Sequence, residues 1–234
     1  MKIAGLQKVS LLDYPGRIAA SVFLAGCNLD CGYCHNRWMI DASAVAEAIS
    51  IPDFLRWLET RVGLLDGVCV SGGEPTIHAE LPVLLREIHA LGMLIKLDTN
   101  GTRPQVVRGV LDEGLADFVA MDIKAPLDAR YDLVAGRAVN VADLRETMAV
   151  LRVWDPTAKQ YEYRTTVEPH IDALALREIA SEVWRCECWA LQPYRPPQDE
   201  TAAQVQGVAF DFEQLQEIAR DLAGVVPGVF VRGE

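Results

Sequence analysis

Apolar and polar residues along the chain alternate between two kinds of segment. Short runs rich in Val, Ile, Leu and aromatic residues, which are typical of buried strands, are separated by longer amphipathic stretches. Six of these runs are expected to form strands: Ile18–Leu24, Gly67–Val70, Leu94–Asp98, Phe118–Ile123, Gln160–Val167 and Cys188–Gln192. A succession of strands and helices favours right-handed βαβ units and therefore a mostly parallel sheet.

The stretches between the runs carry helix signals. A proline near the start and a glycine near the end predict three helices: Pro52 to about Gly63, Leu81 to before Gly92, and Pro104 to about Gly114. Longer patterns predict three more, over Val141–Val153, Ile171–Arg185 and Phe212–Ala223, the last of them after the proline-bearing stretch Gln192–Thr201. The pattern predicts an α/β fold, either a barrel or an open wound sheet, with fewer units than the eight of a full barrel.

Composition and charge narrow the function classes. With 234 residues, 50% of them hydrophobic, the chain can bury a substantial core and is expected to be a single domain. The net charge of -11 disfavours attraction to phosphate backbones or anionic lipids, so neither nucleic acid nor a membrane is an expected partner. The first eight residues lack the apolar core of a signal peptide, and no stretch approaches the roughly 20 apolar residues that span a bilayer. A cytoplasmic location is expected.

Three of the six cysteines, Cys27, Cys31 and Cys34, lie within eight residues. Thiols of cytosolic proteins are kept reduced, so clustered ones there favour metal binding or catalysis over disulfides. Three thiolates can hold three corners of a four-iron, four-sulfur cluster and leave the fourth iron open to another ligand. The alternatives are a zinc knuckle, with His35 as a fourth ligand, or buried thiols, although zinc sites usually take four ligands in paired spacing.

Other polar residues also follow strand ends, where α/β folds carry their chemistry. After the cysteine loop come Ser71–Pro75, Asp98–Gly101 and Met121–Lys124, each at the end of a predicted strand; Arg164 lies within the fifth strand, and Tyr194 and Arg195 follow the sixth. One shared site is therefore expected. Two further cysteines, Cys186 and Cys188, alternate along a strand-like stretch and are expected to point the same way.

The motifs resemble a known family. The CxxxCxxC spacing with Tyr33 before the last cysteine, followed one βα unit later by Gly72-Gly73-Glu74-Pro75, resembles the radical S-adenosylmethionine superfamily. Three further segments, Ser10–Arg17, Cys34–Asn36 and Asp98–Gly101, resemble glycyl-radical-enzyme activating enzymes, above all the anaerobic ribonucleoside-triphosphate reductase activating proteins. The resemblance covers most of residues 3–195. It implies a partial (β/α)6 TIM-like barrel with mostly parallel strands and an open lateral side, in a single radical SAM domain, residues 1–234, with a core of about 15–195 and a C-terminal extension of about 196–234.

The resemblance also implies an activity. A [4Fe-4S] cluster on Cys27, Cys31 and Cys34 would bind S-adenosylmethionine at its open iron, and an electron from flavodoxin or ferredoxin would release a 5′-deoxyadenosyl radical. That radical would take a hydrogen atom from a glycine of a partner glycyl-radical enzyme, here an anaerobic ribonucleotide reductase. The alternatives are a small-molecule radical enzyme resembling 7-carboxy-7-deazaguanine synthase, and a non-catalytic iron–sulfur regulator or zinc-binding module.

The resemblance assigns the second motif to cofactor binding. The loop of Gly72, Gly73, Glu74 and Pro75 is implied to bind the methionine amino group, because glycine lets a backbone approach a ligand closely. Glu74 is expected either to accept a hydrogen bond there or to secure the loop, while Pro75 fixes the turn. The resemblance also implies that Tyr33, which precedes the last cysteine, is one of the residues that bind this cofactor.

Charged residues complete the implied site. By resemblance to pyruvate formate-lyase activating enzymes, Asp98 and Asp122 hold a monovalent cation beside the cofactor carboxylate, since two close carboxylates favour a cation between them. Lys124 is implied to contact the cofactor or the protein substrate. The alternative is that Asp98 caps the loop before the next helix, while Asp122 pairs with Lys124 on a solvated rim.

Two more residues are implied at the cofactor, and the role of a third is open. Asn100 belongs to the Asp98–Gly101 motif and is counted among the binding residues. Arg164 is suited to a bidentate contact with a carboxylate, or alternatively to a structural ion pair with Glu162 or Glu168. Arg195 stands where pyruvate formate-lyase activating enzymes have a histidine that contacts the adenosyl group. Two alternatives are open for Arg195: its side chain stacks on the adenine, or it has no comparable role.

Overall fold

The computed structural model of the chain describes residues 1–155, 157, 159–184, 186–197 and 205–233. The chain forms two compact units. Unit 1 comprises Met1–Asn28, Trp38–Thr99 and Arg103–Val119, and unit 2 comprises Leu29–Arg37, Asn100–Thr102 and the chain from Ala120 onward. The predicted helix end at Arg185 lies outside the described residues. So do residues 198–201 of the predicted stretch Gln192–Thr201.

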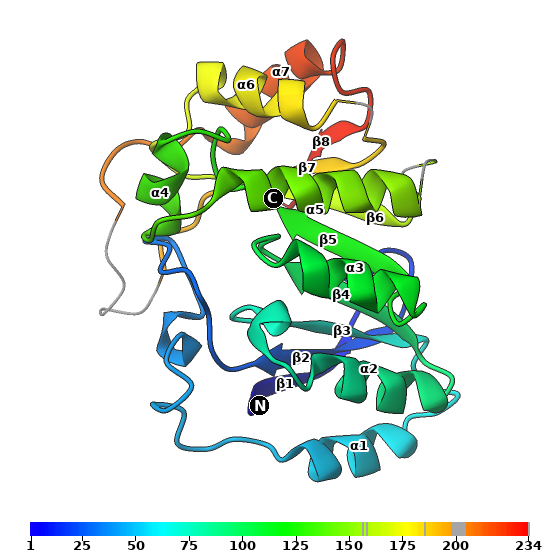
Figure 1. The fold of residues 1–234 in the computed structure, drawn as a ribbon. Coiled ribbons are helices and arrows are strands. Elements are labelled where there is room, and N and C mark those ends of the chain that lie inside the picture. Colours follow the sequence, from blue (N-terminus) through cyan, green and yellow to red (C-terminus); the bar gives the residue numbers. More distant parts are fainter. Residues whose placement is uncertain (156, 158, 185, 198–204, 234) are drawn as a thin grey trace. The chain divides into compact units, whose positions relative to one another are not determined.

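Unit 1 contains the first four strands of the sheet, β1 (Ile3–Ser10), β2 (Ala19–Leu24), β3 (Gly67–Gly72) and β4 (Leu94–Thr99), shown in blue to green in Figure 1. β1 runs antiparallel to β2, whereas β2, β3 and β4 are parallel to one another. The helices of this unit are α1 (Ile51–Glu59), α2 (Leu81–Ala90) and α3 (Pro104–Asp112), with a 3₁₀ turn η2 (Pro75–Ile77) after β3. Another 3₁₀ turn, η1 (Arg37–Met39), begins at the last residue of the unit 2 segment Leu29–Arg37.

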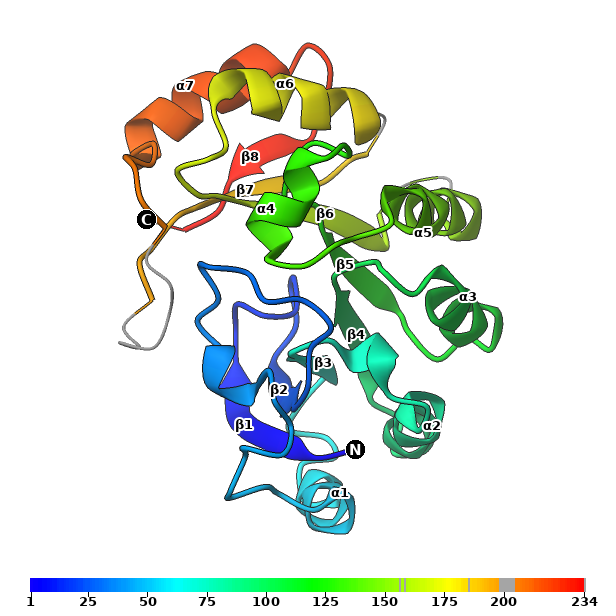
Figure 2. The same cartoon turned by 60° about the vertical axis from the view of Figure 1, so that its left-hand side comes forward.

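Unit 2 contains the last strands, β6 (Tyr161–Val167), β7 (Trp189–Pro193) and β8 (Val229–Val231), which are parallel. β5 (Phe118–Asp122) begins in unit 1 and ends in unit 2. The helices of unit 2 are α4 (Arg130–Ala135), α5 (Val141–Trp154), α6 (Ala173–Glu182) and α7 (Phe212–Leu222). Figure 2 shows α6 and α7 side by side along β7 and β8.

Hydrogen bonds join the strands in the order β1-β2-β3-β4-β5-β6-β7-β8. Among the described residues β1 and β8 are the two ends of this order, so the sheet is not closed. This confirms the predicted α/β class with mostly parallel strands. The six predicted strands are present, each with shifted ends, but β1 and β8 were not predicted. β1 carries Lys8 and Gln7 on an edge, and β8 has only three residues, so neither shows the continuous apolar run of a central strand.

Side-chain caps fix the starts of several helices. Ser50 accepts a hydrogen bond from the N–H of Asp53 at the start of α1, and Asp172 accepts one from Ala175 in α6. Asp211 and Gln214 form a capping box in α7. These contacts satisfy N–H groups that have no partner in the first turn of a helix. None of the helices in the described part of the chain is long and apolar enough to cross a membrane.

Strand alternation separates an apolar face from a polar one in unit 1. In β4, Ile95 and Leu97 are fully buried and α2 packs against this strand. The intervening positions, Lys96 and Asp98, lie on the opposite face, because successive side chains of a strand point to opposite sides. The predicted strand over Cys188–Gln192 begins one residue later, at Trp189, so the expectation that Cys186 and Cys188 alternate along a strand is wrong.

Candidate functional site

The three cysteines of the CxxxCxxC segment follow β2 and are divided between the two units. Cys27 belongs to unit 1, where its N–H donates to the carbonyl of Ile40 at 3.1 Å. Cys31 and Cys34 belong to unit 2, where the N–H of Cys34 donates to the carbonyl of Cys31 at 3.1 Å. None of the three forms a disulfide, and thiolates are the ligands that iron–sulfur clusters use.

Burial and a nearby ammonium act in opposite directions on the thiols of unit 2. Burial raises the pKa of the Cys31 thiol, and the ammonium of Lys124 opposes this effect. Burial likewise raises the pKa of Cys34, while the backbone N–H of Asn36 and Lys124 lower it. A lysine that favours the ionised thiol suits a cluster-binding donor set. In the described part of the chain no three His, Cys, Asp or Glu side chains converge on one metal ion, so cluster binding is inferred from donor chemistry and spacing.

Contacts that the sequence did not reveal fasten the cysteine segment within unit 2. The N–H of Asp30 donates to the carbonyl of Ala135 at 2.9 Å, and the guanidinium of Arg37 pairs with the Asp30 carboxylate at 2.8 Å. A ring nitrogen of His35, Nε2, lies 3.0 Å from the backbone carbonyl oxygen of Arg195. This contact is made by the backbone of Arg195.

The two glycines of the second motif lie against the strand and loop that precede Cys27. A Cβ atom on Gly72, whose φ is +125°, would lie 2.2 Å from the backbone nitrogen of Leu24. A Cβ on Gly73 would lie 2.1 Å from the carbonyl oxygen of Gly26, to which the N–H of Glu74 donates at 2.9 Å. Only glycine fits such approaches. Glycine is required at both positions because the backbone of this loop lies directly against the backbone before Cys27. These close approaches hold the two motifs together inside unit 1.

Glu74 secures this loop. Its side chain is 1% exposed, and Oε1 accepts hydrogen bonds from the N–H of Thr76 at 3.0 Å, from the Thr76 hydroxyl at 2.5 Å and from the Thr99 hydroxyl at 2.8 Å. Pro75 is the first residue of η2, where its missing N–H leaves no bond unmade. Of the two roles expected for Glu74, the structure shows the one that holds the loop.

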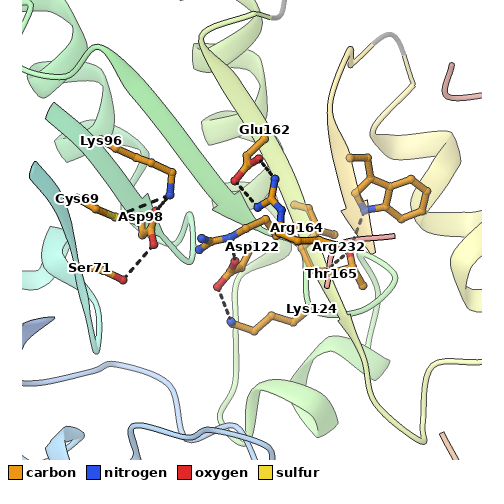
Figure 3. A network of polar contacts seen from close by, with 12 residues as sticks. Cys69, Ser71, Lys96, Asp98, Asp122, Lys124, Glu162, Arg164, Thr165 and Arg232 are labelled. Atoms are coloured by element: carbon orange, nitrogen blue, oxygen red, sulfur yellow. Dashed lines mark hydrogen bonds and ion pairs between the residues drawn. The ribbon is translucent and has the colours of Figure 1, made fainter. Parts of the chain in front are cut away.

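A polar network lies on one face of β3 and β4 (Figure 3). Asp98 accepts a hydrogen bond from the Ser71 hydroxyl at 3.1 Å and forms an ion pair with the ammonium of Lys96. The same ammonium lies 3.8 Å from the sulfur of Cys69, the residue that faces Lys96 in the parallel register. The sequence did not single out Lys96, although its place two residues before Asp98 puts both on one face of the strand. Asp98 thus pairs with a lysine of its own strand.

A second network surrounds Asp122 in unit 2. The Arg164 Nε donates to Asp122 at 2.9 Å, and the Lys124 ammonium pairs with the other carboxylate oxygen at 3.2 Å. The same ammonium lies 5.9 Å from the centre of the Tyr33 ring. Burial alone would lower the pKa of Lys124, but Tyr33 and Asp122 outweigh burial and raise it well above its ordinary value. Arg164 therefore takes Asp122 as an ion-pair partner, and Lys124 keeps its charge in a buried position, not on a solvated rim.

Asn100 shapes the loop after β4. Its side-chain oxygen accepts hydrogen bonds from the N–H of Thr102 at 3.1 Å and from the Thr102 hydroxyl at 2.7 Å. The carbonyl of Gly101 accepts from the hydroxyl of Thr147 at 2.7 Å. A Cβ on Gly101 would lie 2.2 Å from the terminal carbon of Met121. Within unit 2 the loop is therefore held in a fixed conformation by its own polar groups.

A third polar network, between β6 and the residue after β8, was missed by sequence reasoning. Glu162 on β6 is fully buried, and Arg232, directly after β8, donates two hydrogen bonds to it at 2.9 and 2.5 Å. The thiol of Cys188 donates to the same carboxylate at 3.6 Å. No local pattern could have paired residues 70 positions apart in the sequence. The C-terminal extension predicted over residues 196–234 thus supplies the partner of a buried charge.

Comparison with known proteins identifies the family. The model of the radical SAM superfamily matches residues 21–153. A Methanocaldococcus jannaschii protein named as a glycyl-radical enzyme activating enzyme is 30% identical over 200 residues, 83% of this chain and 80% of that protein. The pyruvate formate-lyase 1-activating enzyme of Escherichia coli is 27% identical over 238 residues, 88% of this chain and 94% of that enzyme.

A solved structure shows the same kind of fold. The radical SAM methyltransferase of Sphaerobacter thermophilus has a similar fold, with a TM-score of 0.69 at 15% identity over 94% of this chain and 67% of that one. This likeness concerns the fold alone, and it confirms the predicted class of partial barrel with mostly parallel strands. The family implies a [4Fe-4S] cluster and S-adenosylmethionine as cofactors. The chain therefore belongs to the radical SAM superfamily, in which it is an enzyme close to the glycyl-radical-enzyme activating enzymes.

Proposed function

We propose that this enzyme reductively cleaves S-adenosylmethionine at a [4Fe-4S] cluster and uses the resulting organic radical to generate a glycyl radical on a partner enzyme, an anaerobic ribonucleoside-triphosphate reductase. One observation carries the proposal above the others. The backbone of the glycine motif is fastened to the residue before Cys27, with the Glu74 N–H on the Gly26 carbonyl at 2.9 Å. A cluster ligand and the loop assigned to the cofactor's methionine end are thereby held together.

The residues of the chain have distinct roles in this proposal. Cys27, Cys31 and Cys34 hold the cluster, and Lys124 balances part of the negative charge that thiolates bring into a buried place. Gly72 and Gly73 allow the close backbone approach that the cofactor loop needs.

The remaining binding residues divide between contact and support. Tyr33, Asp98, Asn100, Asp122 and Arg164 are proposed to contact the cofactor or to orient the groups that do. Glu74 and Pro75 fix the loop between β3 and η2 and act through it. No side chain has to act as general acid or base, because the hydrogen atom is taken by the cofactor fragment.

Partners and organisation follow from the same proposal. The electron comes from a low-potential donor such as flavodoxin or ferredoxin, and the enzyme works in a reducing compartment, the cytoplasm. Residues 1–234 act as one radical SAM domain. The pairing of β8 with β7 supports this organisation, because the C-terminal residues then share the sheet of the core.

The first experiment is anaerobic reconstitution with iron and sulfide, followed by reduction in the presence of S-adenosylmethionine. We expect methionine and 5′-deoxyadenosine, and we expect Cys31→Ala to lose both the cluster absorbance and the product. Cys186→Ala is the matched control, since Cys186 is a buried thiol outside the CxxxCxxC segment. Absence of 5′-deoxyadenosine from the wild-type protein with a full cluster would overturn the catalytic proposal.

The second experiment identifies the partner. Mixing the reduced enzyme with anaerobic ribonucleotide reductase should give the doublet of a glycyl radical in electron paramagnetic resonance spectra. A doublet that forms only with a different glycyl-radical enzyme would show that this other enzyme is the partner. Turnover of a small molecule, without a doublet from any glycyl-radical enzyme, would favour the alternative that resembles 7-carboxy-7-deazaguanine synthase.

A further inference from the structure

Asp98 receives its positive charge from the chain itself. Lys96 lies two residues earlier on β4, and its ammonium pairs with one carboxylate oxygen of Asp98. The other oxygen accepts the Ser71 hydroxyl at 3.1 Å. Both oxygens of Asp98 are therefore engaged by groups of unit 1, one of them cationic (Figure 3).

The register of β3 and β4 places the groups around Asp98 on one face of the sheet. Cys69 faces Lys96 across the parallel strands, so Cys69, Ser71, Lys96 and Asp98 share one face of β3 and β4. The Lys96 side chain is only 2% exposed, and that of Asp98 is 13% exposed. A buried ammonium is strongly unfavourable unless an opposite charge compensates it, so Lys96 stays with Asp98.

This arrangement does not fit the monovalent cation expected from the resemblance. A sodium or potassium ion binds to oxygen ligands and brings one positive charge. The ammonium of Lys96 already brings one positive charge to Asp98. In unit 2, Asp122 is likewise paired with Lys124 at 3.2 Å and with Arg164 at 2.9 Å. Each aspartate thus has a cationic partner from its own unit.

We propose that Lys96 is a positioning residue that replaces the monovalent cation at Asp98, so that S-adenosylmethionine binding needs neither sodium nor potassium. The inference rests on the proposed function, because it takes Asp98 to lie beside the cofactor. A fixed ammonium orients the carboxylate at all salt compositions, whereas an exchangeable ion would do so only above its dissociation constant.

The first test uses the wild-type protein in sodium, potassium or choline chloride at equal ionic strength. Two quantities are measured: the unfolding temperature of the protein without cofactors, and the dissociation constant of S-adenosylmethionine by equilibrium dialysis of the reconstituted protein. We expect both to be the same in the three salts. A loss of affinity of about tenfold in choline chloride would overturn the proposal. So would an unfolding temperature that rises with potassium or sodium.

The second test removes the ammonium while keeping the length of the side chain. In Lys96→Met, Asp98 loses its positive partner, so we expect weaker binding in choline chloride and recovery of about tenfold when sodium or potassium is added. Lys8→Met is the matched control, an exposed lysine on β1 of the same unit, and should behave as the wild type. A folded Lys96→Met protein that binds equally in all salts would contradict the proposal. If this variant does not fold, the wild-type measurements decide.

The measurements separate this inference from the proposed function. Cation-independent unfolding together with absent 5′-deoxyadenosine would reject the catalytic proposal and leave the compensation of Asp98 by Lys96 intact. Formation of 5′-deoxyadenosine that depends on sodium or potassium would support the catalytic proposal and reject the replacement of the cation by Lys96.

Discussion

Asp98 in unit 1 and Glu162 in unit 2 are both paired carboxylates, yet they are paired in different ways. Asp98 stands at a strand end, keeps 13% of its side chain exposed, and takes a lysine from two residues earlier on the same strand. Glu162 lies inside β6 with no exposure and takes Arg232 from beyond β8. A locally paired, partly exposed acid is suited to meet a ligand. A fully buried acid with a distant partner is suited to join strands, and its removal is therefore expected to change stability and not binding.

The largest expected effect on stability comes from breaking the distant pair. Arg232→Met leaves the Glu162 carboxylate buried without its cation, which costs about 3 kcal/mol of unfolding free energy. Urea denaturation measures this loss, and the affinity for S-adenosylmethionine should stay unchanged in the folded fraction. Arg220→Met, an exposed arginine on α7, serves as control. Lost affinity with unchanged stability would mean that Glu162 and Arg232 belong to the binding site.

Asp98→Asn should show the opposite pattern. The amide keeps the shape and the contact with Ser71 but no longer neutralises Lys96, so we expect about a tenfold loss of affinity for S-adenosylmethionine. The stability cost should be about 1–2 kcal/mol, below that of Arg232→Met, because the amide oxygen still accepts a hydrogen bond from the Lys96 ammonium. Equilibrium dialysis and urea denaturation of the same preparation test both parts. Unchanged affinity would assign Asp98 to structure alone.

Ser71→Ala sharpens the comparison with a smaller change. It removes one hydrogen bond to Asp98 and leaves the ion pair with Lys96 in place. We expect a loss of about 1 kcal/mol in stability, and an affinity that falls less than in Asp98→Asn. An effect on affinity as large as that of Asp98→Asn would show that the hydroxyl, and not the charge, positions the carboxylate.

The smallest expected effect concerns pH. Burial, together with the nearby Glu162 carboxylate, raises the pKa of the Cys188 thiol from 9.0 to about 12. The unfolded chain ionises this thiol at the ordinary pKa, so the folded state loses stability as the pH rises from about 9 toward 12. In Cys188→Ala this loss should be smaller, which urea midpoints between about pH 8 and pH 11 would detect. An unchanged pH dependence would mean that the thiol is not held neutral by its surroundings.

Much of the fold was readable from local pattern. Val68 and Val70 of β3, and Ile95 and Leu97 of β4, predict buried strands because apolar residues at alternate positions lie on one face of a strand. β1 and β8 escaped for the converse reason: an edge strand and a three-residue strand carry too few apolar positions. Glu74 was recognised, but its role was left open between a ligand contact and the loop, since only the positions of Thr76 and Thr99 decide it.

The sequence by itself determined the cysteine spacing, the glycines of the second motif and the alternation of strands and helices, because each depends on neighbours along the chain. From these features the family followed. The tertiary structure decided which charges meet. Lys96 reaches Asp98 because both share a strand face, Arg164 pairs with Asp122, and Arg232 compensates Glu162 because β6, β7 and β8 lie in one sheet. The strength of an ion pair depends on the distance between the charges and on their burial. Strand order and register set both, and sequence separation does not reveal them.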